Sequence, residues 1–245
     1  MAAHSNLSPL SYGAAAPAAA SPPAPAPALP ESWDWFAEAN AYHPPAWYRA
    51  AEIVISAAML VVAAPVILAF AIAVKHESAG PAFFVQTRMS TNCRRFRFFK
   101  LRTMYVDWER RFPKLALEDL RNQDPAQIRL KTPGDPRVTP LGHFLRRTSV
   151  DELSNFWHVL TGDMTLVGPR PEIPELLPHY HGKMLEKFSV KPGITGYAQI
   201  HGRGDLTFLR TVQHDLRYVQ ERSLAVDLRV LRQTVASVLL GRGAY

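Results

Sequence analysis

The sequence contains a single cysteine, Cys93, among its 245 residues. Cys93 alone cannot form an internal disulfide, which suits a reducing compartment and argues against a cysteine-based metal cluster. The nine histidines show neither an HExxH motif nor another compact metal-ligand spacing. A zinc site is therefore not expected.

Basic residues are absent from the first part of the chain, since residues 1–47 carry three acidic residues and no Lys or Arg. Residues 1–30 hold eleven Ala and seven Pro, so we expect a disordered or polyproline-like tail. Without a basic start and an uninterrupted apolar run, it is not a secretory signal. The remaining chain carries 28 basic against 18 acidic residues, a net charge of +10. Such a basic body suits nucleic acid, anionic lipid headgroups or phosphorylated substrates.

Charge is also absent from residues 53–74, which lie between Glu52 and Lys75. As a straight helix this segment would be about 33 Å long, enough to cross a hydrocarbon core of about 30 Å. A membrane role is expected, with a buried helix of a soluble protein as the alternative. Pro65 lies near the middle and favours a kink or break. Two geometries stay open: a kinked spanning helix, or two half-helices that return to the same face. The basic run at 88–102 favours a cytoplasmic C-terminal side.

After this segment the chain is expected to form one α+β unit that is mainly helical. Residues 82–86 and 96–100 have the composition of two short strands, with a turn-prone stretch between them. Helices are expected at 105–122, 141–147, 174–188, 214–218 and 225–240, and a loop at 124–135. Apolar side chains on these helices are expected to pack into the core, and a position at the membrane surface is the alternative for those that are exposed.

The stretch from Ser149 to Leu153 places two carboxylates side by side. Ser149 followed by Glu152 is a capping-box pattern. An apolar face at helical spacing follows, made of Leu153, Phe156, Trp157 and Leu160. We therefore expect Asp151 in a first helical turn, where unpaired N–H groups favour a carboxylate and can receive an anionic ligand. Asp151 is a candidate nucleophile; the alternative is that it merely satisfies helix-end donors.

Several cations are candidate ligands of phosphate, because Arg gives bidentate contacts and Lys a mobile charge. They are Lys100, Arg102, Arg137, Arg146, Arg147, Arg170 and Lys191. Arg170 stands out because Pro169 and Pro171 fix the backbone on both sides. Gly193 and Gly196 suggest a tight loop that a ligand can approach, or a structural turn. Carboxylates beside phosphate suit Mg²⁺.

These motifs together resemble those of the bacterial sugar transferases, which are monotopic polyprenyl-phosphate phosphoglycosyl transferases. The continuous part of the resemblance runs from Asp135 through the Asp151-Glu152 dyad to Glu172. Further matches are Gly80-Pro81, Gln86 with Arg88, Lys100 to Met104, Lys191 to Gly196 and Gly243-Ala244. The resemblance implies a tail at 1–46, a re-entrant helix-break-helix at 47–78 with its break at Pro65, and a compact catalytic domain at 79–245. It also implies interfacial amphipathic helices, with the domain on the cytoplasmic face of the bacterial inner membrane.

The reaction implied by this resemblance transfers a phosphosugar from a nucleotide diphosphate sugar, expected to be a UDP-hexose, to polyprenyl (undecaprenyl) phosphate. A nucleoside monophosphate is released, as the first membrane step of exopolysaccharide or other glycoconjugate assembly. Asp151 would form a covalent intermediate and Glu152 would help bind Mg²⁺. Lys100, Arg146 and Arg170 would neutralise phosphate charge. Membrane lipids are expected partners and nucleic acid is not; a catalytically silent membrane adapter is the principal alternative.

The sequence departs from the common pattern of this family at a few positions. Ser154 stands where Pro is common and His158 where Asn is common. Ser90 and Cys93 replace glycines between the two expected strands, and Glu52 replaces an Asp. If those glycines need positive φ, the hairpin would be strained or reshaped. All the proposed catalytic groups are retained.

Overall fold

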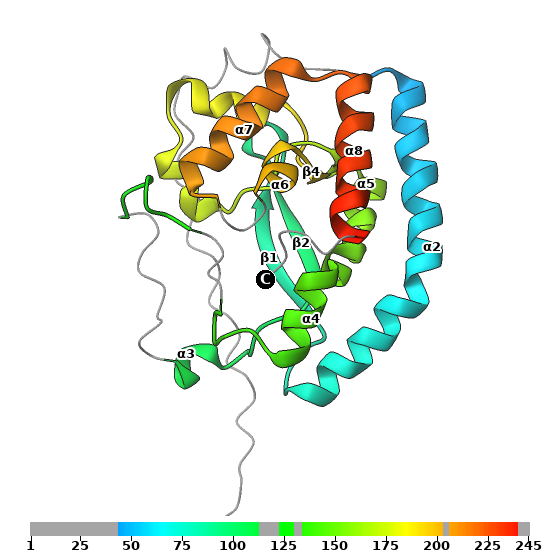
Figure 1. The fold of residues 1–245 in the computed structure, drawn as a ribbon, viewed down its shortest axis with the longest axis vertical. Coiled ribbons are helices and arrows are strands. Elements are labelled where there is room, and N and C mark those ends of the chain that lie inside the picture. The colour runs from blue at the N-terminus through cyan, green and yellow to red at the C-terminus, as the bar shows by residue number, and fades with distance from the viewer. Residues whose placement is uncertain (1–43, 113–122, 130–133, 203–205, 240–245) are drawn as a thin grey trace, which may run out of the picture. The chain divides into compact units, whose positions relative to one another are not determined.

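The computed structural model describes residues 44–112, 123–129, 134–202 and 206–239, and most of the expected tail lies outside them. The described residues form mainly helices with two small sheets (Figure 1). The α-helices are α2 (Ala46–Glu77), α3 (Trp108–Arg111), α4 (Pro140–Thr148), α5 (Phe156–Thr161), α6 (Tyr197–His201), α7 (Phe208–Glu221) and α8 (Leu224–Leu239). The strands are β1 (Phe83–Met89), β2 (Arg95–Leu101), β3 (Thr165–Val167) and β4 (Gly193–Thr195). Short 3₁₀ helices are η2 (Thr91–Cys93), η4 (Val150–Asn155), η5 (Pro174–His179) and η6 (Gly182–Ser189).

The apolar segment forms α2, a single helix of 32 residues that continues through Pro65. The predicted break at Pro65 is therefore wrong: Figure 1 shows the helix changing direction part-way along its length without an interruption. Its buried residues form one narrow stripe, namely Tyr48, Glu52, Ser56, Ala63 and Val74. The other faces are largely exposed, with Val61 at 75%. A helix this apolar and this exposed meets the length and composition required to cross a membrane.

Polar contacts hold both ends of α2 to the rest of the described chain. Near the N-terminal end, Tyr48 donates to the Asp227 carboxylate of α8 at 2.5 Å. The buried carboxylate of Glu52 accepts the backbone N–H of Leu166 at 2.9 Å. At the other end, the Arg102 guanidinium donates to the carbonyls of Val74, Ser78 and Ala79. These three bonds tie the last turn of α2 and the two residues that follow it to Arg102, which comes directly after β2.

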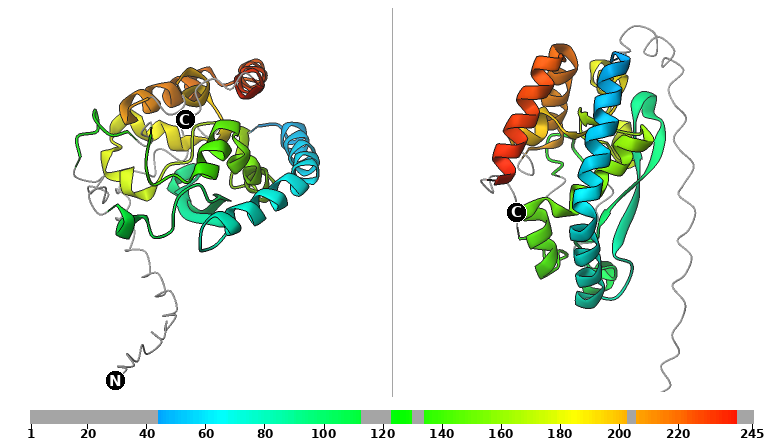
Figure 2. Two further views of the ribbon diagram at one scale, coloured as in Figure 1. Left: turned by 60° about the horizontal axis from the view of Figure 1, so that its bottom comes forward. Right: turned by 90° about the vertical axis from the view of Figure 1, so that its right-hand side faces the viewer.

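The expected hairpin is confirmed, because β1 and β2 pair antiparallel from Phe83–Leu101 to Met89–Arg95. Its turn places Cys93 at φ 52° and Asn92 at φ 53°, in the left-handed region. Cys93, which stands where the family commonly has glycine, therefore occupies a conformation that glycine adopts at lower cost. Ser90 has φ −104° and needs no glycine. Figure 2 shows the hairpin running along the second part of α2.

Close backbone approach explains the two glycines at the parallel pair of β3 and β4. A Cβ on Gly193 would lie 2.0 Å from the backbone nitrogen of Gly168. A Cβ on Gly196 would lie 2.1 Å from the Gly168 carbonyl oxygen. These contacts support the structural alternative for the loop, since any side chain would force the two segments apart.

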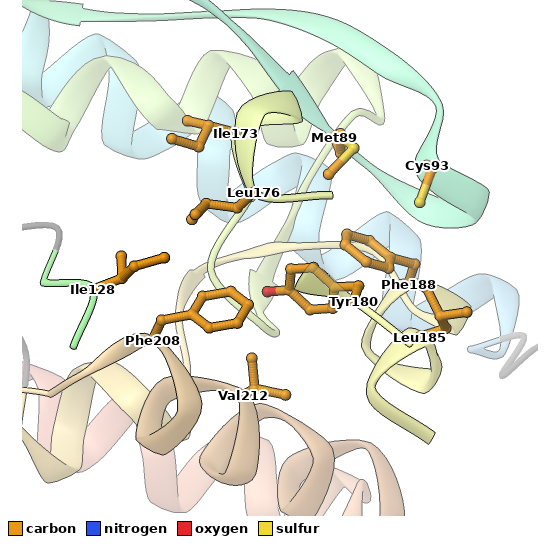
Figure 3. Packing of buried hydrophobic residues seen from close by; sticks show 10 residues of the cluster. All are labelled: Met89, Cys93, Ile128, Ile173, Leu176, Tyr180, Leu185, Phe188, Phe208 and Val212. Atoms are coloured by element: carbon orange, nitrogen blue, oxygen red, sulfur yellow. The ribbon is translucent and has the colours of Figure 1, made fainter. Parts of the chain in front are cut away.

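Three clusters of buried apolar side chains form the core. The first joins the hairpin turn to η5, η6 and α7, and Figure 3 shows the Tyr180 ring between those of Phe188 and Phe208. The second joins β2, β3 and the C-terminal helices around Phe98 and Tyr218. The third contains Val74, Leu101 and Leu145, and thereby attaches α2 to β2 and α4. Burying each such side chain contributes roughly 1.5–3 kcal/mol.

Helix predictions differ in their outcome. The helices expected at 141–147 and 225–240 correspond to α4 and α8, and that at 214–218 lies inside α7. The helix expected at 174–188 is instead two 3₁₀ helices, because Pro178 and Gly182 interrupt it. Of the helix expected at 105–122 the structure describes only α3, and residues 113–122 lie outside the described residues.

Candidate active site

The predicted capping box at Ser149 is wrong. Ser149 has φ 60° and ψ 18°, ends α4 in the left-handed conformation, and in the described structure its side chain makes no cap hydrogen bond. The following residues form a 3₁₀ helix, in which the N–H of Glu152 donates to the Ser149 carbonyl at 3.1 Å. Asp151 nevertheless lies in a first turn, as expected.

The 3₁₀ geometry also changes which face of this segment is buried. The expected apolar face included Trp157, which is 51% exposed. The buried residues are Asp151, Ser154, Asn155, His158 and Val159. The 3₁₀ helix has three residues per turn and precedes α5, so a pattern that assumes one continuous α-helix from Ser149 assigns the wrong residues to the core.

Asp151 is 3% exposed, and its Oδ2 lies 2.9 Å from the Lys100 ammonium. Arg146, on α4, donates from Nε to the Thr103 hydroxyl at 3.0 Å. Burial lowers the pKa of the Arg146 guanidinium, and the negative charges of Asp151 and Asp135 oppose that shift. Arg146 therefore lies within electrostatic reach of Asp151. The structure thus surrounds the carboxylate with cations from two other elements.

Glu152 faces a different cation, Arg170. Its Oε1 lies 3.5 Å from an Arg170 nitrogen, and both side chains are partly exposed. Arg170 belongs to the loop after β3, in the sequence Gly168-Pro169-Arg170-Pro171. The two adjacent carboxylates are therefore divided between two cations, Lys100 for Asp151 and Arg170 for Glu152.

Ser154 and His158, the two residues after the dyad that differ from the common family pattern, hold β2 beside the dyad. Phe99 donates its backbone N–H to Nε2 of His158 at 3.1 Å, and the Ser154 hydroxyl donates to the Phe99 carbonyl at 3.3 Å. Lys100 is the next residue of the strand, so both bonds fix its position relative to Asp151. An Nε2 that accepts this bond carries no proton, and burial lowers the pKa of His158 accordingly.

A buried ionic network anchors the loop that carries Arg170. The Lys187 ammonium lies 2.9 Å from Glu172 and 3.1 Å from Asp215, and Tyr180 donates to Glu172 at 2.7 Å. Burial would raise the pKa of Glu172, but Lys187, Tyr180 and Arg88 together lower that pKa below its usual value. Burial raises the pKa of Asp215 to about 6, and Lys187 opposes that shift. Sequence reasoning missed this network, because no local spacing relates Lys187 to its two partners.

The other predicted phosphate ligands lie away from the dyad's direct contacts. Arg102 donates to the Ser78 and Ala79 carbonyls after the end of α2, and phosphate binding by Arg102 stays a prediction. Arg137 binds Asp135 through two nitrogens, at 2.7 and 2.9 Å. Arg147 is exposed on α4, and Lys191 lies near Gly162 at the end of α5. Phosphate binding by Arg137, Arg147 and Lys191 stays a prediction.

The residues around the dyad fit a magnesium ion held mainly by its substrate. Among the described residues there is no group of three or more His, Cys, Asp or Glu that could hold a metal alone. Mg²⁺ needs only one or two carboxylates when phosphate oxygens and waters complete its shell. Glu152, partly exposed beside Arg170, offers such a carboxylate.

Comparison with known families accounts for this arrangement. Residues 45–241 match the family described as bacterial sugar transferase. The chain belongs to this family. The match covers α2, the hairpin and every element of the site, and it ends near the end of α8. The resemblance seen in the sequence is therefore confirmed.

Named relatives of this sugar transferase come from several bacteria. It is 41% identical over 169 residues to the galactosyl transferase CpsE of Streptococcus agalactiae serotype III (strain NEM316), which covers 69% of this chain and 37% of that protein. It is 37% identical over 208 residues to the undecaprenyl-phosphate glucose phosphotransferase of Komagataeibacter xylinus, covering 80% of this chain and 36% of that one. These matches therefore span little more than a third of either relative. The exopolysaccharide production protein ExoY of Sinorhizobium fredii (strain NBRC 101917 / NGR234) is 33% identical over 202 residues, which cover 80% of this chain and 87% of that relative.

Proposed function

We propose that this protein transfers a sugar phosphate from a UDP-hexose to undecaprenyl phosphate and releases UMP. The observation that carries the proposal is the pair of carboxylates divided between Lys100 and Arg170. Relatives named as undecaprenyl-phosphate glucose phosphotransferase and as UDP-glucose:undecaprenyl-phosphate glucose-1-phosphate transferase support the same reaction. The relative named for exopolysaccharide production supports a role in that kind of pathway.

In the first half of the proposed reaction, a carboxylate oxygen of Asp151 attacks the phosphorus that carries the sugar. The bond from that phosphorus to the bridging oxygen of the diphosphate breaks, and UMP leaves with the bond's electron pair. The product is an acyl phosphate between Asp151 and the sugar phosphate. Lys100 already lies 2.9 Å from the attacking carboxylate, so its charge is available to the incoming phosphate without rearrangement of the strand.

In the second half, an oxygen of the lipid phosphate attacks the same phosphorus. The acyl bond breaks, the Asp151 carboxylate is restored, and the new diphosphate links lipid to sugar. Arg146 and Arg170 would neutralise the phosphates throughout. Glu152 would hold Mg²⁺, which when bound supplies further positive charge beside the phosphate oxygens.

We also propose that α2 enters the membrane and returns to the same face. Both of its ends are held by polar groups of the catalytic body, Asp227 and Leu166 at one end and Arg102 at the other. A spanning helix would separate its ends by about 30 Å of hydrocarbon, in which such polar groups are costly. The bend of the helix and the exposed Trp47 and Trp157 support a shallow position beside the headgroups. This geometry would place the dyad near a lipid-linked phosphate on the cytoplasmic face of the inner membrane.

UMP release from the detergent-solubilised protein tests the proposed activity. With Mg²⁺, undecaprenyl phosphate and either UDP-glucose or UDP-galactose, we expect release with at least one donor and none from Asp151→Asn. Arg110→Ala is the matched control, because the Arg110 side chain is 88% exposed and contacts only Asp107 at 3.7 Å among the described ion pairs. A folded protein that releases no UMP with a broad panel of sugar donors would contradict the proposal.

A further inference from the structure

A small hollow lies on the Glu152 side of the dyad. Its lining includes Arg88 of β1, Phe98 of β2, Asn155 of η4 and Met164, with Glu152 and Arg170 also contributing. The lining also includes Pro171, Gly193 and Ile194, so apolar side chains lie beside the polar groups of Arg88 and Asn155. Glu152 and Arg170 belong both to the hollow and to the proposed phosphate site, so a ligand of one is continuous with a ligand of the other.

Two buried polar atoms in this lining lack hydrogen-bond partners within the described part of the chain. One is Oδ1 of Asn155, whose residue is only 3% exposed. The other is Nε of Arg88, whose NH1 already donates to the Pro171 carbonyl at 3.0 Å. Buried polar atoms without partners are uncommon and costly, so they mark places where a ligand completes the bonding.

The two atoms require a ligand group that can donate and accept. Asn155 Oδ1 accepts a hydrogen bond, and the Nε–H of Arg88 donates one. A hydroxyl group does both through one oxygen atom.

The connectivity of the donor indicates which of its parts lies here. The phosphorus attacked by Asp151 is bonded directly to the sugar oxygen, whereas the nucleoside is one phosphate further away. A hollow lined by Glu152, the neighbour of Asp151, is therefore within reach of the sugar. Asn155 lies on the same short 3₁₀ helix as both carboxylates, which fixes its position relative to the reacting phosphate.

We propose that this hollow, whose free volume of about 10 Å³ holds one water-sized group, receives a hydroxyl of the donor's sugar ring, and that Asn155 and Arg88 determine which hexose the enzyme accepts by bonding that hydroxyl. The inference rests on the proposed transferase activity. It assigns sugar selection to a residue within the dyad's own helix rather than to the loops beyond it.

The test compares two epimeric donors, UDP-glucose and UDP-galactose, in the full-length protein and in Asn155→Ala. We divide kcat/KM for the donor that the wild type prefers by kcat/KM for the other donor. This ratio should fall about tenfold in the variant, which is the effect of losing one well-placed hydrogen bond. Arg88→Lys, which keeps the charge but lacks Nε, should change the ratio in the same direction. Arg110→Ala should leave it unchanged. An unmoved thermal unfolding midpoint in Asn155→Ala, together with an altered ratio, separates selection from folding.

Binding of UMP distinguishes the sugar from the nucleotide as the occupant. UMP carries no hexose, so its affinity, measured by calorimetry, should be the same in wild type and Asn155→Ala. Weaker UMP binding in the variant would overturn the inference and assign the hollow to the nucleotide. An unchanged donor ratio in an active variant would also overturn it while leaving the transferase proposal intact. Failure of the wild type to release UMP from any donor would instead overturn the transferase proposal, and this inference with it.

Discussion

The Lys100 ammonium lies 2.9 Å from the Asp151 carboxylate, although 51 positions separate the two residues in the chain. Lys100 is on the second strand of the hairpin and Asp151 on the 3₁₀ helix after α4. The hairpin therefore serves the site by carrying one cation to the proposed nucleophile. Its position depends on the bonds that Phe99 makes with Ser154 and His158.

Replacing Lys100 should impair the first half-reaction more than donor binding. Lys100→Met removes the cation nearest the attacked phosphate, and we expect the single-turnover rate of UMP release to fall about 10²- to 10³-fold. Lys100→Arg should retain part of the rate, because the charge remains but its geometry changes. The measurement is rapid-quench UMP release without lipid acceptor. A Lys100→Met enzyme with the wild-type rate would show that the ion pair is structural only.

His158 should make stability depend on pH. Its folded pKa is lowered from the usual 6.5 by burial, so the unfolded chain binds a proton that the folded protein resists. The stability contributed by neutral His158 is present above pH 6.5 and is lost as the pH falls toward the folded pKa. His158→Asn should remove this loss, because an asparagine oxygen can accept the Phe99 N–H without titrating.

Thermal unfolding of both proteins in detergent across this pH range checks the prediction. The difference between their midpoints isolates His158 from His214, whose pKa is also lowered by burial and which is present in both proteins. Parallel pH profiles for the two proteins would contradict the assignment of the proton to His158.

The network around Lys187 should dominate the stability of the Arg170 loop. Lys187→Met leaves Glu172 and Asp215 buried without their shared cation, and we expect the free energy of unfolding to fall by about 3–5 kcal/mol.

Asp215→Asn should behave differently, since burial raises the pKa of Asp215 to about 6. Between the ordinary pKa of 3.8 and about 6 the unfolded chain releases this proton while the folded protein keeps it, so the stability of the wild type falls across that range and levels off above it. Asp215→Asn should therefore gain relative to wild type as the pH rises to about 6. Chemical unfolding at pH values on either side of 6 measures the stability of Lys187→Met and of Asp215→Asn. An Asp215→Asn protein whose stability relative to wild type does not rise with pH would contradict the prediction for Asp215.

A re-entrant α2 places both of its ends on one side of the membrane. Trp47→Cys and His76→Cys each introduce an exposed thiol near one end, while the native Cys93 is buried. In sealed vesicles of known orientation, an impermeant thiol reagent should label both positions from the cytoplasmic side. Labelling of the two positions from opposite sides would show that the helix spans the bilayer.

Much of the fold follows from local sequence patterns, and the exceptions have identifiable causes. The hairpin, α4 and α8 were predictable from strand composition and helical spacing. The capping box predicted at Ser149 is wrong, although the spacing of Ser149 to Glu152 fits that motif. The backbone of Ser149 instead takes the left-handed conformation that ends α4. Proline and glycine converted the region after Pro174 into 3₁₀ helices, which an apolar pattern alone does not reveal.

The site shows the same division between local and distant information. Asp151, Glu152, Lys100, Arg146 and Arg170 were all selected from the sequence as site candidates, and the structure brings them into one region. The partners of Glu172 and of Phe99 were not predictable, because those contacts join residues far apart in the chain through tertiary packing. Arg102, a predicted phosphate ligand, donates to carbonyls at the end of α2, a contact that its place in the sequence does not reveal.

The most direct test of the account is to trap the covalent intermediate. Full-length protein is mixed with UDP-hexose labelled in the sugar phosphate, with Mg²⁺ and without lipid acceptor, then quenched and digested for mass spectrometry. The proposed covalent mechanism predicts UMP release that approaches one equivalent, with the sugar phosphate attached to the peptide that contains Asp151. It predicts no adduct in Asp151→Asn. An adduct that still forms in Asp151→Asn, or UMP release that requires the acceptor, would contradict it.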